Sequence, residues 1–264
     1  AQVVHLELDP SEIDKNVKCA VPVLGDCKQS LPLLTDAVNS NTHHEWFEKF
    51  RELDKEEKAA VMSYDLESTH GGLHMGEVIQ LINQFKDENA ILVTDVGQHQ
   101  MISWRYFNYK ESRTQVTSGG LGTMGFALPA ALGAQLHDFK RQVICVVGDG
   151  GIQMTIQEFG TIMQTKAPVK VVLLNNNYLG MVRQWQQLFF DKRYSFTELE
   201  NPDFIKIAEA YKLRAVKVTE RHELKEAVAQ MILHEGPFFL EVVVEKEDNV
   251  FPMIATGCSV EEVR

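Results

Sequence analysis

The stretch GDGG at residues 148–151 places an aspartate between glycines, directly after the apolar run RQVICVV. A carboxylate at the end of a buried strand can bind a divalent cation, and neighbouring glycines let a diphosphate come close to the backbone. Asn175 and Asn176 end the next apolar run and supply amide oxygens, which hard cations also accept. The gap between them and Asp149 suits one crossover helix and one strand. The sequence therefore predicts a site for a cation and a diphosphate at one edge of a sheet.

Other strand ends carry the same kind of residues. These are the strand ends TDVGQHQ (94–100) and LNNNYLG (174–180). The segment TSGGLGTMG (117–125) lies between TDVGQHQ and GDGG, and all of these segments are rich in Gly, Asn or Asp. In open α/β sheets ligands bind outside the carboxyl ends of the strands, so we expect these segments to meet there. A helix expected to begin near Thr155 would turn its free N–H groups toward the site. A Rossmann site is excluded, because no G-x-G-x-x-G opens a helix after the first strand.

The elements that must position these residues form a regular series from residue 75 to about residue 245. Apolar runs without polar alternation are separated by segments with helical spacing, which is typical of parallel strands buried on both faces. We therefore predict a doubly wound α/β fold with a parallel sheet.

The region before residue 75 divides in two. Residues 1–40 indicate two strands and two short helices, too little to bury their own faces, so we interpret them as the end of an α/β domain that precedes this sheet. Residues 41–74 are charge-rich and predict a solvated helix followed by a linker that ends at Gly71 and Gly72. The predicted organisation is 1–40, 41–74 and 75–264.

Composition excludes several classes of protein. With 264 residues, 44% hydrophobic and 24% charged, the chain is typical of a globular protein, and its net charge of −11 argues against nucleic acid or an acidic membrane as partner. No run approaches the roughly 18 apolar residues that span a bilayer, and the start lacks the pattern of a signal peptide, so we expect a cytoplasmic protein. The four cysteines form no C-x-x-C pair, which excludes the usual zinc and iron–sulfur patterns.

Longer motifs point to a family. The segments GDGG and LLNNN, together with VGQHQM, TSGGLGTMGFALPAALGAQ, NNNYLGMVRQWQQLF and NPDFIKIAEA, resemble the catalytic subunit of the acetohydroxyacid synthases (acetolactate synthases), which are thiamine-diphosphate enzymes. The resemblance covers essentially the whole chain: residues 1–40 match the end of the family's middle domain, and 70–264 match its diphosphate-binding C-terminal domain. It implies decarboxylation of pyruvate and condensation with a second 2-ketoacid, in branched-chain amino acid biosynthesis.

The resemblance also implies roles for individual residues. The implied Mg²⁺ ligands are Asp149, Asn176 and the backbone carbonyl of Tyr178. The implied residues around thiamine diphosphate are Val96, Gly97, Gln98, His99, Gly122, Met124, Gly148, Gly150, Gly151, Leu179, Gly180 and Met181. Met124 would lie beneath the bent cofactor. The substrate would be covered by Met181, Val182 and Trp185, and a flavin (FAD) would approach Gly119 and Gly120 at an incomplete site.

The family's activating glutamate belongs to a pyrimidine-binding domain that these residues do not resemble. We therefore assign no catalytic acid or base, and we expect the chain alone to be inactive. The family pattern implies a homodimer or homotetramer and a possible regulatory small subunit. Two alternatives are the diphosphate-binding subunit of a split enzyme and a non-catalytic cofactor-binding remnant. A third is a different decarboxylase or carboligase, and Trp185 is the residue that best distinguishes an acetolactate synthase from these enzymes.

Overall fold

The computed structural model describes residues 2–68, 71–255, 257–259 and 261–263. The chain divides into two compact units, Ala1–Lys55 and Glu56–Arg264. The elements of the first unit are β1 (Val4–Glu7), the 3₁₀ turn Pro10–Glu12, β2 (Val21–Leu24), α1 (Cys27–Ala37) and α2 (His44–Glu57), which ends just beyond it. The strands β1 and β2 pair in parallel. No described residue of this unit is buried, as expected for so few elements.

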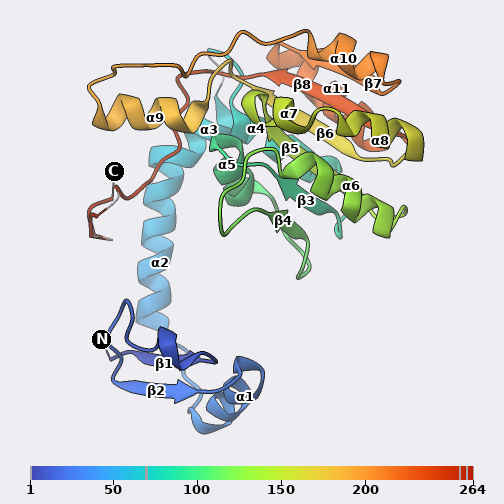
Figure 1. The fold of residues 1–264 in the computed structure, drawn as a ribbon. Helices are drawn as coiled ribbons and strands as arrows, with labels where there is room; N and C mark the ends of the chain where they lie inside the picture. Colours follow the sequence, from blue (N-terminus) through green and yellow to red (C-terminus); the bar gives the residue numbers. More distant parts are fainter. Residues whose placement is uncertain (1, 69–70, 256, 260, 264) are drawn as a thin grey trace. The chain divides into compact units, whose positions relative to one another are not determined.

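The second unit is built on one parallel sheet of six strands in the order β4-β3-β5-β6-β8-β7 (Figure 1). The strands are β3 (Ile91–Thr94), β4 (Gln115–Thr117), β5 (Val143–Gly148), β6 (Lys170–Asn175), β7 (Arg214–Val218) and β8 (Phe238–Val243). Every neighbouring pair runs in parallel. The predicted doubly wound α/β fold is confirmed.

Both faces of the sheet are covered. On β5, Ile144 and Val146 join one core while Val143 and Cys145 join the other, because successive side chains point to opposite faces. This explains why the strands read as continuous apolar runs. One core contains residues of α4 (Met75–Phe85), α5 (Gln98–Tyr106) and α11 (Arg221–Leu233). The other contains residues of α6 (Ala127–His137), α7 (Asp149–Thr155), α8 (Glu158–Thr165) and α10 (Phe204–Ala210).

Part of the predicted linker is helical. After α2, a π turn, Lys58–Met62, leads into α3 (Ser63–Glu67), so the stretch interpreted as a solvated helix and linker is helical up to Glu67. The reason is a tertiary contact: the Tyr106 hydroxyl on α5 donates to the buried carboxylate of Asp65. No helix in the described part of the chain has the length and apolar character needed to cross a membrane.

The topology creates a crevice at the carboxyl ends of the central strands. From β3 the chain passes through α5 to β4 on one side, whereas from β5 it passes through α7 and α8 to β6 on the other. Because α5 and α8 contribute to opposite cores, the segments that leave β3 and β5 diverge. Ligand sites of doubly wound sheets lie at such switch points.

Candidate functional site

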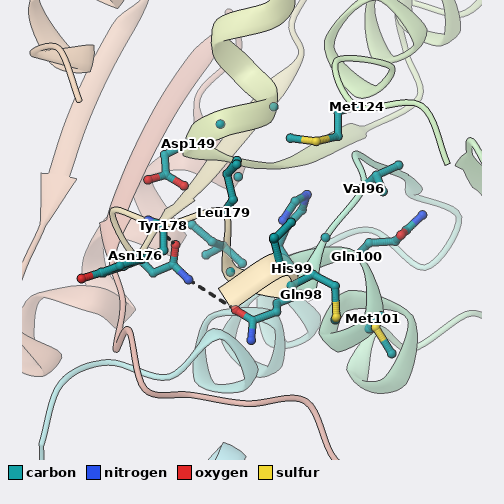
Figure 2. Close-up of a pocket in the computed structure, with 18 of the residues that line it drawn as sticks. Val96, Gln98, His99, Gln100, Met101, Met124, Asp149, Asn176, Tyr178 and Leu179 are labelled. Carbon is teal, nitrogen blue, oxygen red and sulfur yellow. Dashed lines mark hydrogen bonds between the residues drawn. The ribbon is translucent and has the colours of Figure 1, made fainter. Parts of the chain in front are cut away.

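A pocket of about 280 Å³ lies at this switch point. Four stretches and Met75 at the start of α4 line it. The stretches are the end of β3 with the start of α5, the loop before α6, the β5–α7 turn, and the loop from β6 into α9 (Gly180–Phe189). Figure 2 shows Asp149, Asn176 and Tyr178 on one side of the pocket and Met124 and Val96 on the other.

The structure brings nearly all of the predicted site residues together. The pocket is lined by Val96, Gly97, Gln98, His99, Gly122, Met124, Gly148, Asp149, Gly150, Gly151, Asn176, Tyr178, Leu179, Gly180, Met181 and Val182. Trp185 lies outside this set and lines a second cavity with Arg193 and Phe190. Val182 borders both cavities, so the three residues expected to cover the substrate are distributed over two adjoining hollows.

The helix expected near Thr155 begins earlier. α7 starts at Asp149, immediately after β5, and a separate helix, α8, starts at Glu158. Glycine is a poor helix former, so the pair Gly150 and Gly151 led us to expect the helix to begin after them. The structure shows what the glycines are for: a Cβ at Gly150 would lie 2.6 Å from Leu179 Cδ2, and one at Gly151 would lie 1.8 Å from Asp95 Oδ2.

Asp149 is a buried carboxylate without a cationic partner. Its side chain is 2% exposed, and no ion pair among the described residues includes it. Burial raises the pKa of this carboxyl to about 6, against hydrogen bonds, chiefly from Asn201, that lower it. A buried anion of this kind is stabilised when a cation binds beside it.

The two asparagines after β6 point in different directions. Asn175 donates through Nδ2 to Glu241 Oε1 at 2.8 Å, away from the pocket. Asn176 lines the pocket, where its Oδ1 accepts from the Tyr178 backbone N–H at 3.1 Å. Its Nδ2 faces Gln98 Oε1 at 3.4 Å (Figure 2). No group of three or more His, Cys, Asp or Glu suitable for a metal exists among the described residues, so a cation here needs amide and carbonyl oxygens besides Asp149.

His99 presents an unsatisfied polar atom. The residue is 6% exposed, and Nε2 has no hydrogen-bond partner. Burial lowers the pKa of the imidazole to about 4, so the ring is neutral at physiological pH. Its ring packs so closely on Gly148 that a Cβ there would lie 2.9 Å from it. A buried, unpaired ring nitrogen on a pocket wall fits a polar ligand that completes its hydrogen bonding.

Two residues that contact the site were not predicted from the sequence. Asn201 donates to Asp149 Oδ2 at 2.7 Å. Asp95, fully buried, accepts from the backbone N–H groups of Gly125 and Ala127 and so holds the loop that carries Met124. The segment TDVGQHQ could have suggested Asp95, whereas the motif NPDF suggests a helix start rather than a site. Gly119 and Gly120 are exposed and lie outside the pocket, so the flavin site stays a prediction.

Comparison with known proteins agrees with this geometry. Residues 95–242 match the family described as thiamine pyrophosphate enzyme, C-terminal TPP binding domain. The chain is 36% identical to the acetolactate synthase isozyme 2 large subunit of Escherichia coli (strain K12), over 100% of this chain and 47% of that protein. It is 39% identical to the acetolactate synthase large subunit of Lactococcus lactis, over 100% of this chain and 45% of that protein.

A solved structure is also similar. The thiamine diphosphate-dependent 4-hydroxybenzoylformate decarboxylase of Rhodococcus jostii RHA1 superposes with a TM-score of 0.63 at 26% identity, over 67% of this chain and 34% of that one. The chain spans about half the length of the curated relatives named above. The resemblance found in the motifs and the expected diphosphate-binding fold are both confirmed.

Proposed function

We propose, because this chain belongs to the thiamine pyrophosphate enzyme family, that it forms the diphosphate- and Mg²⁺-binding part of an acetolactate synthase large subunit. The observation that carries the proposal is the convergence of Asp149, Asn176 and the unpaired His99 Nε2 in one pocket at the switch point. The similarity of the whole chain to acetolactate synthases supports this reaction among those of the family.

The residues present suit such a cofactor. Asp149, the Asn176 side chain and the Tyr178 carbonyl would hold Mg²⁺, an arrangement of oxygens that a hard cation prefers. Gly148, Gly150 and Gly151 of the β5–α7 turn line the pocket without side chains of their own, so a diphosphate there would meet the backbone, and His99 would offer it a ring nitrogen. Thiamine diphosphate, when bound, supplies the electron sink for decarboxylating a 2-ketoacid.

The substrates follow from the proposed enzyme. We propose pyruvate and a second 2-ketoacid, with Met181 and Val182 at the pocket and Trp185 at the adjoining cavity as the surfaces that cover them. Apolar side chains near the site, among them Val182 and Phe190, are exposed, which supports association with a further domain or subunit. A homodimer or homotetramer, a regulatory small subunit, FAD and a cytoplasmic location belong to the same proposal.

Calorimetric titration of the chain with thiamine diphosphate tests the proposal. We expect binding that depends on Mg²⁺, and we expect Asp149→Asn to weaken it on the order of 100-fold, because a ligand charge is lost while the shape is kept. Glu158→Gln is the matched control, since it removes the same charge from the start of α8, outside the pocket. Equal binding with and without Mg²⁺, or an unchanged affinity of Asp149→Asn, would contradict the proposed metal site.

The chain alone should make no acetolactate from pyruvate. No acid or base is assigned to the pocket, and its buried carboxylate is committed to the proposed metal. A colorimetric assay with saturating Mg²⁺ and thiamine diphosphate measures this, and sustained turnover would show that the described residues include an activating group.

A further inference from the structure

One side-chain amide connects all of the segments that carry the proposed metal ligands. The Asn201 Nδ2 lies 2.7 Å from Asp149 Oδ2, 3.1 Å from Asn175 Oδ1 and 3.1 Å from Asn177 Oδ1. Asp149 follows β5, and the two asparagines follow β6. A single donor group therefore joins the ends of two neighbouring strands at the edge of the pocket.

The orientation of this amide is fixed by a second side chain. Gln153 Nε2 on α7 donates to Asn201 Oδ1 at 3.1 Å and to the backbone oxygen of Asp149 at 3.0 Å. With its oxygen turned to Gln153, Asn201 must present its NH₂ group to the carboxylate. The flip state of Asn201 is thus determined by the hydrogen-bond network.

The same loop holds the turn that carries the other two proposed ligands. Asn177 lies between Asn176 and Tyr178 and has a left-handed backbone, with φ of +58°. Its carbonyl accepts from the Leu199 backbone N–H at 2.8 Å, and its side chain accepts from Asn201. The segment around Asn201 therefore fixes this turn through both backbone and side chain.

We propose that Asn201 is a positioning residue, which holds Asp149 and the turn 176–178 in the arrangement that binds a divalent cation. The inference rests on the proposed function and adds a residue to it that does not itself touch the cation. Hydrogen-bonded partners of metal ligands commonly set ligand orientation, and their loss costs roughly 10- to 100-fold in metal affinity.

Replacing Asn201 by leucine tests this role. Leucine has the same branching at Cγ but no donor, so Asn201→Leu should keep the fold and release the carboxylate. Mn²⁺ binding to the chain, followed by electron paramagnetic resonance with and without thiamine diphosphate, is the readout. We expect a roughly 10- to 100-fold weaker Mn²⁺ affinity and a midpoint of thermal unfolding close to that of the unaltered chain.

Asp203→Ala is the matched control on the same loop. Asp203 accepts from the Lys206 backbone N–H and caps α10, without contact to Asp149. Its loss should lower the unfolding midpoint and leave Mn²⁺ affinity unchanged, which separates positioning from loop stability. Gln153→Ala, at an exposed position, should weaken Mn²⁺ binding by a few fold, because the Asn201 amide loses its orienting partner.

The outcomes separate this inference from the function beneath it. If the unaltered chain binds Mn²⁺ and both Asn201→Leu and Gln153→Ala bind it equally well, Asn201 is structural only and the inference is overturned while the proposed function stands. If Asn201→Leu does not fold, Gln153→Ala alone decides. If the unaltered chain binds no Mn²⁺, the proposed function falls and this inference falls with it.

Discussion

At the scale of single residues, the site depends on positions where a side chain is missing. Gly148 lies against His99, Gly151 against Asp95, and Gly180 against Gln98, each too closely for a Cβ. These glycines do not need unusual backbone angles; they are required because other side chains occupy the space. The glycines of the motif GDGG are therefore required by the packing around the site as well as by the proposed ligand.

Gly151→Ala should destabilise the chain by about 1–3 kcal/mol. The new methyl group would lie 1.8 Å from Asp95 Oδ2, and Asp95 cannot move aside because the Gly125 and Ala127 amides hold it. Gly133→Ala is the control: this exposed glycine lies within α6 with nothing within 4 Å of a Cβ, so the change should stabilise by about 0.5–1 kcal/mol. Urea unfolding measures both, and equal effects would contradict the packing argument.

The positions of the proposed metal ligands could be predicted from the sequence, whereas the position of Asn201 beside them could not. Asp149 and Asn176 each end an apolar strand, so local pattern and topology alone place them at one edge. Asn201 lies in a loop 52 residues beyond Asp149, and no local period reveals that it returns to the site. Its motif, NPDF, carries the signal of a helix start, which is also correct, since Asp203 caps α10. That signal gives no indication of the contact with Asp149.

At the scale of elements, errors arose where tertiary contacts override local preference. α7 begins at a run of Asp and Gly that would not start a stable helix alone. α5 was not predicted, since its first turn, QHQ, lacks an apolar period, yet it buries Ile102 and Tyr106. The long apolar strands could be predicted from the sequence alone, because a strand that is buried on both faces is a continuous run of apolar residues.

The start of α4 is joined to the segment after β8 by a buried pair. His74 Nδ1 lies 3.0 Å from Asp248 Oδ2, and the two side chains are 2% and 8% exposed. The hydrogen bond with Asp248 raises the pKa of His74, against desolvation, which lowers it. Since the folded pKa is above the unfolded value, this stabilisation is fully present below about pH 6.5 and is lost as pH rises through the folded pKa.

His74→Asn should therefore destabilise the chain more at pH 6 than at pH 8.5. Asparagine still suits the N-cap position of α4 but does not titrate, so the variant isolates the charged pair. We expect a loss of about 1.5–3 kcal/mol at pH 6, the range for a hydrogen bond to a charged group. Denaturant unfolding at the two pH values measures the difference, and a loss that grew with pH would reverse the sign and refute the assignment.

At the scale of the whole molecule, topology explains why one sheet edge can host this chemistry. The segments after β3 and β5 diverge, and β6 brings its asparagines alongside the second of them. Because all of the strands are parallel, their carboxyl ends lie at the same edge of the sheet. Topology alone does not select a reaction, because one fold hosts many chemistries, so the proposed reaction rests on the family similarity.

The two compact units should differ strongly in local stability. No described residue of the first unit, Ala1–Lys55, is buried, whereas the second, Glu56–Arg264, has a core on each face of its sheet. Proteases cut where local unfolding costs least, so limited digestion with trypsin should begin in the first unit, at sites such as Lys18 or Lys28, and leave a resistant product that retains the sheet. Mass spectrometry of the early products identifies the cuts.

A chain that begins at Glu56 should unfold at nearly the same temperature as the whole chain, since both cores lie within it. Early cleavage between β3 and β8, or a large fall in that temperature, would show that the sheet needs the first unit for its stability.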